Sequence, residues 1–389
     1  MTQTQIISFL VNHPQFAQRL LSQHYPFSLQ QLKRYGSGLA WGLVSTNTNI
    51  GWSSQILWQF AELLQWRSIS MNPSAFPSLD MLTEFDALID WEGWEDGSGD
   101  TIANNLGLPW TEELVRSLEH KISFERLSTN ESVQWSEALI DRYKGRWELS
   151  DLACNESVPW TLPLFERHLN ESYFFYFGVS TNPALLRNID LVEKYSHKME
   201  WWAVFANSQL PWIEKRLLER WREHINWYGL SQNEFFFRTD KDFFTNNMDR
   251  WMENEGKGFV GLSSNRYLPW STDFIDRYLP LWRWTTLCEN ESIPWDEKMI
   301  DHFANHVEWG GTKPAAIYSE DGEMLAPTGG FYFEFGLIDN KNLPWSLDLL
   351  KRYESQFNLD DLSEHSYIWK KAFMPYIDDN VLDTVLRII

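Results

Sequence analysis

The signal Leu-Pro-Trp-Ser/Thr, or a close variant, recurs along this chain at a fixed spacing, which constrains the fold more than any other feature. Trp110, Trp135 and Trp160 lie 25 residues apart, and Trp270 and Trp295 have the same separation. A fixed period of this length is the signature of a tandem repeat, in which each unit is one small supersecondary element. The sequence therefore predicts about a dozen units of roughly 25 residues, in which each unit buries its apolar face against its neighbours.

The tryptophan of each signal is expected to be a structural anchor in the core. The set consists of Trp52, Trp110, Trp135, Trp160, Trp212, Trp270, Trp295 and Trp345. Tryptophan at a repeated position is more often core than ligand box, and the period accounts for much of the chain's 23 tryptophans.

The unit that begins at Trp135 reads WSEALIDRYKGRWELSDLACNESVP. Ser136 suits a helix N-cap, because its hydroxyl can accept hydrogen bonds from amides of the first turn. Leu139, Tyr143 and Trp147 recur every four residues, which predicts one apolar stripe on a helix of about three turns.

A shorter segment of the form aromatic-x-x-Leu-Ser-x-Asn follows and fits one or two further helical turns. Asparagine tolerates left-handed backbone and hydrogen-bonds to nearby backbone, so we expect it to end the short helix. The asparagines treated as repeat anchors are Asn130, Asn155, Asn233, Asn265 and Asn290.

These observations predict a mainly α fold, an α-solenoid of short helix, short helix and turn, with one insertion resembling a β-hairpin. The alternative is an α/β solenoid like the leucine-rich repeats, in which a short strand ends at an asparagine ladder. The predicted organisation is an N-terminal cap at 1–26, repeats at 27–309, an insertion at 310–341, a last repeat at 342–365 and a C-terminal cap helix at 366–389.

The pattern W-x-x-LS-x-N-x-x-LPWS-x-x-LI-x-RY, over roughly residues 27–365, resembles tryptophan-rich tandem repeats of uncharacterised bacterial and giant-virus proteins. The resemblance implies a repeat architecture. It brings no activity or site residues with it.

Charge and composition narrow the classes of function. The net charge of -21 argues against nucleic-acid binding, which requires clustered cations, and favours a protein partner with a neutral or basic surface. Two cysteines exclude a disulfide framework, and no apolar stretch approaches the length of a membrane span. We therefore expect a cytoplasmic protein.

No motif for phosphate binding, dinucleotide binding or nucleophilic catalysis occurs, so we expect neither an enzyme nor a cofactor. The nearest approach to a metal motif is His302 and His306, whose spacing places both imidazoles on one helical face with Asp301 and Glu308 nearby. The preferred interpretation is two polar residues that flank Phe303 and Val307, both expected to be buried, with no metal bound.

Departures from the repeat are better guides to function than the repeat itself. Residues 91–104 add an acidic, glycine-rich loop, and residues 235–259 replace the anchor with phenylalanine clusters. In the insertion, Asp321-Gly322 predicts a hairpin turn and 331–335 alternate as a strand would. The candidate partner-binding residues are Tyr318, Glu320, Asp321, Glu323, Phe331, Tyr332 and Phe333.

The leading functional hypothesis is a non-catalytic scaffold or adaptor that binds another protein. One alternative is an accessory component of a bacterial defence or conflict system, acting as effector, inhibitor or protease substrate. The other is a cryptic metal-dependent hydrolase centred on His302 and His306.

Overall fold

A computed structural model describes residues 2–93, 99–169, 172–213, 215–318 and 324–389 of the chain, and for 173–174, 253–259 and 313–334 it describes only the backbone. The described chain is mainly helical and divides into two compact units. One unit holds residues 21–226, and the other holds residues 227–389 together with 1–20. None of the helices in these ranges combines the length and the apolar character that crossing a bilayer requires.

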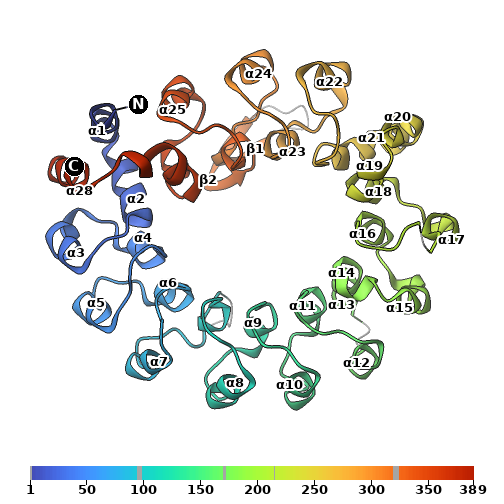
Figure 1. Ribbon diagram of the computed structural model, residues 1–389, viewed down its shortest axis with the longest axis horizontal. Coiled ribbons are helices and arrows are strands. Elements are labelled where there is room, and N and C mark those ends of the chain that lie inside the picture. Colours follow the sequence, from blue (N-terminus) through green and yellow to red (C-terminus); the bar gives the residue numbers. More distant parts are fainter. Residues whose placement is uncertain (1, 94–98, 170–171, 214, 319–323) are drawn as a thin grey trace. The chain divides into compact units, whose positions relative to one another are not determined.

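Most helices are one or two turns long and alternate along the chain as the repeat predicts (Figure 1). Residues 21–226 hold α3 (Leu29–Tyr35), α4 (Trp41–Thr46), α5 (Ser54–Gln59), α6 (Trp66–Met71), α7 (Asp80–Glu84), α8 (Glu112–Leu118), α9 (Phe124–Ser128), α10 (Glu137–Arg142), α11 (Leu149–Cys154), α12 (Leu162–Arg167), α13 (Tyr173–Thr181), α14 (Pro183–Leu186), α15 (Ile189–Lys194), α16 (Trp201–Ala206) and α17 (Leu217–Arg220). Within this unit the first helices of the repeats, such as α8 and α10, form one row, and the second helices, such as α9 and α11, form another.

The other unit follows the same alternation with more irregularities. It holds α1 (Gln3–Asn12), α18 (Trp227–Gln232), α19 (Glu234–Thr239), α20 (Phe243–Asn246), α21 (Met248–Leu262), α22 (Thr272–Arg277), α23 (Trp284–Glu289), α24 (Glu297–His302), β1 (Gly311–Tyr318), β2 (Met324–Glu334), α25 (Leu347–Arg352), α26 (Leu359–Leu362), α27 (Ser366–Ile368) and α28 (Asp379–Ile388). Helix α2 (Pro14–His24) contains the boundary at residue 20.

The first helix of each repeat is shorter than the apolar stripe predicts. Ser136 caps α10 by accepting from the Leu139 amide at 3.0 Å, but the helix ends at Arg142, so the predicted three turns are wrong. Trp147 lies beyond the helix end and turns back, donating Nε1–H to the Ile140 carbonyl at 3.1 Å. This bond satisfies a carbonyl that the helix end leaves without a partner. The spacing of four residues between Leu139, Tyr143 and Trp147 therefore reflects packing around the end of the helix rather than a longer helix. Beyond that end, the ring centroids of Trp147 and Trp135 lie 5.0 Å apart.

Asparagine ends the short helix, but in extended rather than left-handed backbone. Asn155 follows α11 with φ -74° and ψ 111°. Its Nδ2 donates to the carbonyls of Ser128 at 3.0 Å and Asn130 at 3.3 Å in the preceding repeat, while Oδ1 accepts from the Ser157 amide at 3.0 Å. Asparagine makes three hydrogen bonds at once here, two as donor and one as acceptor. Neither aspartate nor leucine can replace it, because neither side chain has the amide donor.

The same bonds link successive repeats into an asparagine ladder. In the unit 21–226 its members are Asn47, Asn72, Asn105, Asn130, Asn155 and Asn182, and in the other unit they are Asn265, Asn290 and Asn340. In the described repeats a helix precedes each of these asparagines, whereas the leucine-rich alternative requires a strand at that place. That alternative is wrong.

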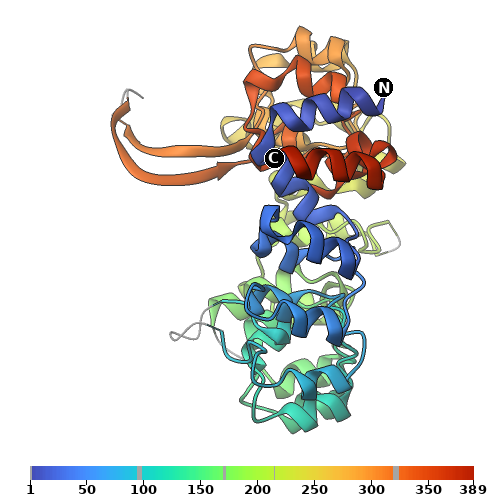
Figure 2. The same ribbon diagram turned by 90° about the vertical axis from the view of Figure 1, so that its left-hand side faces the viewer.

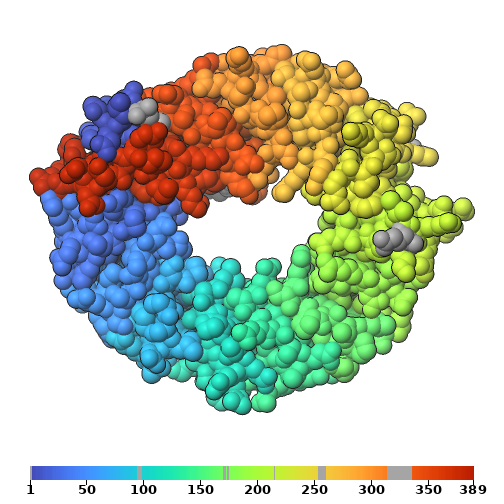
Figure 3. Space-filling model, in the orientation of Figure 1, coloured from blue at the N-terminus to red at the C-terminus, as the bar shows by residue number. Residues whose placement is uncertain are grey.

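A second set of bonds between repeats involves the serine of the Leu-Ser-x-Asn segment. Ser128 Oγ accepts the Glu148 amide at 3.0 Å, and Ser263 Oγ accepts the Arg283 amide at 3.0 Å. Both serines are fully buried, so the amide that begins each short helix is satisfied by the repeat before it. In the space-filling view, consecutive repeats of 21–160 accordingly pack side by side (Figure 3).

The two ends of the chain pack against each other within one unit. The predicted N-terminal cap at 1–26 contains two helices, α1 and α2, because Pro14 starts α2. Phe9 and Phe16 lie 6.1 and 5.6 Å from Phe373 between ring centroids, and Gln3 Nε2 donates to Asp378 Oδ2 at 3.0 Å. Residues of the predicted N-terminal cap that lie in this unit thus cover apolar surface of the predicted C-terminal cap at 366–389.

Candidate functional site

The anchor tryptophans lie at the turns of the ladder. Trp52, Trp110, Trp135, Trp212, Trp270 and Trp345 each donate Nε1–H to the carbonyl of the asparagine five residues earlier. Trp160 differs, because it donates to the Leu152 carbonyl at 3.1 Å, and Nε1 of Trp295 is buried without a partner. Trp135 and Trp160 are half-buried and the other six are buried, so these residues belong to the scaffold rather than to an open site.

The insertion forms an antiparallel hairpin of β1 and β2 that extends away from the helices of its unit (Figure 2). The register pairs Gly311 with Glu334 and Tyr318 with Met324. Of the candidate partner-binding residues, Tyr318 ends β1, and Phe331, Tyr332 and Phe333 lie in β2. Glu320, Asp321 and Glu323 lie outside the described residues.

The base of the hairpin is tied to the helices by specific contacts. Gly310 and Gly311 have φ of 80° and 93°, the left-handed region that glycine adopts without strain. The Asp361 carboxylate in α26 accepts the Thr312 amide at 2.7 Å and the Thr312 hydroxyl at 3.0 Å. The hairpin therefore leaves the helices in a defined direction.

The insertion lies inside the first turn of a short helix. In the uninterrupted repeat, the Leu152 amide donates to the Glu148 carbonyl at 3.0 Å as the first bond of α11. The same bond closes the hairpin, from the Leu337 amide to the Glu308 carbonyl at 2.8 Å. It also closes the shorter insertion near 91–104, from the Ile102 amide to the Asp90 carbonyl at 3.0 Å. Both insertions occupy one position of the repeat.

This geometry corrects the predicted boundary of the insertion. Leu337 and Ile338 are fully buried, and Asn340 Nδ2 donates to the carbonyls of Cys288 at 2.9 Å and Asn290 at 3.2 Å. Residues 337–341 of the predicted 310–341 insertion therefore belong to the repeat. The ladder continues across a spacing of 50 residues without a break.

Three titratable side chains gather near the hairpin base. Burial raises the pKa of Asp339 and also that of Glu289, whose pKa the Asp339 carboxylate raises further. Burial lowers the pKa of His365, against the opposing effect of Asp339. Asp339 Oδ2 accepts the Gly336 amide at 2.9 Å, so this carboxylate helps to hold the chain where it leaves β2.

The histidine pair is not assembled into a metal site. His302 Nε2 lies 2.8 Å from Asp276 Oδ2, whereas the His306 ring stacks on Trp284 with centroids 5.0 Å apart. Asp301 pairs with Arg352, and the Glu308 carbonyl accepts the Leu337 amide at the start of the short helix. No group of three or more potential metal ligands occurs among the residues that the structure describes.

Sequence reasoning missed a cavity of about 420 Å³ in the irregular region that contains α19, α20 and α22. Aromatic side chains dominate its wall, namely Phe237, Phe244, Tyr267, Phe274 and Tyr278. The rings of Phe244, Phe274 and Tyr278 form a mutual cluster with centroids 5.3 to 5.5 Å apart. The phenylalanine cluster of residues 235–259 was the available sequence signal.

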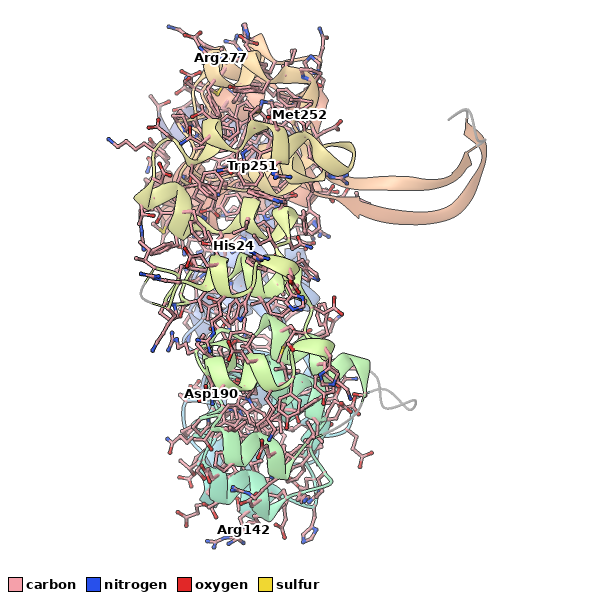
Figure 4. All side chains as sticks on the ribbon, turned by 90° about the vertical axis from the view of Figure 1, so that its right-hand side faces the viewer. His24, Arg142, Asp190, Trp251, Met252 and Arg277 are labelled. Carbon is pink, nitrogen blue, oxygen red and sulfur yellow. The ribbon has the colours of Figure 1, made fainter. Side chains whose placement is uncertain are left out.

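Polar side chains also line this cavity, and two of them are cations. Lys241 comes from the segment between α19 and α20, and Arg277 ends α22. Both are exposed at its mouth, and Figure 4 places Arg277 at the surface of its unit, whereas Trp251 lies among interior side chains. A cavity of this size with an apolar wall and a few polar groups is typical of small-molecule sites.

No protein-family model matches this chain, nor does any curated protein or solved structure.

Proposed function

We propose that this chain is a non-catalytic repeat scaffold or adaptor that binds another protein through the hairpin of β1 and β2. The observation that carries the proposal is the closure of the insertion by the Leu337 to Glu308 backbone bond. The repeat loses no ladder bond when it accommodates the hairpin, so the hairpin is free to serve a different purpose. Its fixed base, through Asp361 and Thr312, gives a partner a surface of defined direction.

The backbone of the hairpin favours recognition by strand addition. In a two-stranded sheet each strand pairs on one side only, which leaves a second row of amides and carbonyls for another chain. Pro314 interrupts β1 and Pro327 interrupts β2, and residues 328–334 form the longest run without proline. We propose that the partner pairs with this run of β2 and, given the charge of -21, presents a neutral or basic surface.

We further propose that the repeats stack as an α-solenoid related to the tryptophan-rich tandem repeats that the sequence resembles. The ladder bonds between successive repeats support this. Small-angle scattering tests it, because a compact domain of this length has a radius of gyration of ~21 Å and a row of stacked repeats exceeds ~26 Å.

The binding proposal is tested by removing the hairpin at its closure. Replacing residues 310–336 by Thr-Thr, which copies Thr285-Thr286 of the preceding repeat, restores the 25-residue spacing. Affinity capture from the native host should lose the partner, and calorimetry with the purified partner should detect no binding. The matched control replaces residues 92–100 by one serine, the equivalent operation at the other insertion, and should bind normally. The proposal is wrong if the hairpin-free variant captures the same proteins.

A further inference from the structure

Neighbouring repeats are linked by ion pairs at one recurring position. The basic residue near the end of the first helix pairs with a carboxylate of the preceding repeat. Arg142 lies 3.3 Å from Glu112, and Arg167 lies 3.0 Å from Glu137 and 3.2 Å from Asp141. The other such pairs are Lys194 with Glu166, Arg220 with Glu193, and Arg352 with Glu297 and Asp301. The His302 imidazole makes the equivalent contact with Asp276.

Arg277 occupies this position but makes no ion pair with the described residues of the chain. The repeat before Arg277 can be aligned with the repeat of Trp135 by means of equivalent hydrogen bonds from tryptophan indoles. Trp147 donates to the carbonyl seven residues earlier, and Trp251 donates to the Phe244 carbonyl in the same way at 2.8 Å. The positions of Glu137 and Asp141 are thereby occupied by Lys241 and Thr245. The two carboxylates are replaced by a cation and a hydroxyl.

These three side chains surround the aromatic cavity. Lys241, Thr245 and Arg277 all line it, together with the aromatic residues described above. Asp240 also lines it, but its Oδ1 already accepts the Asp242 amide at 3.0 Å. The Thr245 hydroxyl already donates to the Asp242 carbonyl at 3.1 Å, so the donors left for an anionic group are the two cations. These outnumber the single Asp240 carboxylate beside the apolar wall, in a chain that is otherwise strongly acidic.

We propose that this cavity binds a small aromatic carboxylate, whose carboxylate group replaces the acidic side chains that the preceding repeat lacks. The carboxylate pairs with Arg277 and Lys241, since guanidinium and ammonium groups are its strongest hydrogen-bond donors. The aromatic body packs against the rings of Phe244, Phe274 and Tyr278 in offset or edge geometry. The volume of about 420 Å³ accommodates one to three fused rings. This site is independent of the hairpin.

Calorimetric titration of the full chain tests the proposal with benzoate, 2-naphthoate and 9-anthracenecarboxylate as probes. At least one of them should bind, and its uncharged alcohol analogue should bind at least about tenfold more weakly, because it lacks the charge-assisted hydrogen bonds. Arg277→Ala should weaken the carboxylate by about tenfold or more. Arg142→Ala, at the same position of a repeat with an intact ion pair, should leave affinity unchanged.

A charge-restoring variant separates binding from folding. Lys241→Glu places a carboxylate at the position that Glu137 holds for Arg167, so the protein should fold at least as well as the parent while probe binding disappears. Binding that survives Lys241→Glu, equal affinity for the alcohol, or failure of all three carboxylates to bind would each overturn the proposal.

Discussion

Trp110 and Asn130 donate to the same atom, the carbonyl oxygen of Asn105, at 2.9 and 3.2 Å. Trp110 belongs to the turn that Asn105 begins, whereas Asn130 comes from the next repeat. The carbonyl uses its two lone pairs for one bond within a repeat and one bond between repeats. Turn formation and stacking are therefore coupled through one buried acceptor, which explains why the asparagine and the tryptophan recur together.

Removal of one ladder side chain should destabilise the protein strongly. Asn130→Ala leaves the Ala103 carbonyl without its donor, weakens the bonding of the Asn105 carbonyl, and removes the acceptor for the Ser132 amide. We expect the free energy of unfolding to fall by about 2 to 4 kcal/mol in urea titrations. The neighbouring Thr129 is exposed, and Thr129→Ala should cost less than about 0.5 kcal/mol. If both variants lose the same free energy of unfolding, the ladder bonds do not contribute to stability.

The tryptophan bond can be measured by comparing two anchors. Trp110 is fully buried and donates to Asn105, whereas Trp295 is buried to a similar extent with Nε1 unpaired. Replacement by phenylalanine removes similar apolar area at both sites but a hydrogen bond only at Trp110. Trp110→Phe should therefore cost about 1 kcal/mol more than Trp295→Phe in the same denaturant assay. The opposite order would show that the indole bond adds nothing to stability.

The sequence was sufficient for the period, the helical class, the N-caps and the place of the hairpin, because each depends on local residue pattern. It suggested an asparagine ladder only through the leucine-rich alternative and could not show which groups bond, because the donor in Asn155 and the acceptor in Asn130 are 25 residues apart and only the packing of successive repeats brings them together. The apolar stripe through Tyr143 and Trp147 predicted too long a helix for a related reason. A four-residue spacing has the same appearance whether the second residue continues the helix or folds back over its end.

The phenylalanine cluster was a sequence signal for the apolar wall of the cavity, but the sequence could not show the cationic side, because that side is defined by the ion-pair partner that Arg277 lacks among the described residues. Arg277 has the same local context as Arg142, and only the ion pairs of the other repeats identify it as an exception. Lys241 and Thr245 could be aligned with Glu137 and Asp141 only through the indole bond of Trp251. The irregular spacing of residues 235–259 obscures that alignment in the sequence.

The two cysteines should differ sharply in reactivity. Cys288 is fully buried at the position that serine holds in the Leu-Ser-x-Asn segment of other repeats, and its thiol accepts the Glu308 amide at 3.4 Å. Burial raises the pKa of this thiol to about 12. It should stay protonated and unreactive in the native protein up to pH 8. Cys154 is exposed, although partial burial of its thiol also raises its pKa. A chromogenic disulfide reagent at pH 8 should therefore titrate one thiol before unfolding and two after it.

Substitution of Cys288 tests whether sulfur is needed at this position. Cys288→Ser should change the free energy of unfolding by less than about 1 kcal/mol, since Ser128 and Ser263 accept the equivalent amide with oxygen. Cys288→Ala leaves the Glu308 amide unpaired and should cost about 1 to 3 kcal/mol. If alanine is tolerated as well as serine, the bond to the next repeat is not a source of stability.

The last prediction concerns where the hairpin can be cut. Replacing residues 310–336 by Thr-Thr keeps the Leu337 to Glu308 bond, the buried Leu337 and Ile338, and the Asn340 ladder bonds. A shorter loop also costs less closure entropy, which offsets the lost contact between Thr312 and Asp361. The free energy of unfolding should therefore stay within about 2 kcal/mol of the parent.

A cut only a few residues longer should have the opposite effect. Replacing residues 312–341 by a short Gly-Ser linker removes Leu337, Ile338 and Asn340, and with them two buried apolar side chains and the donor to Cys288 and Asn290. We expect a loss of more than about 4 kcal/mol, measured by the same urea titration. If both deletions are tolerated equally, residues 337–341 do not belong to the repeat. If both unfold the protein, the hairpin itself contributes to the core, and its proposed role as a separable binding element fails with it.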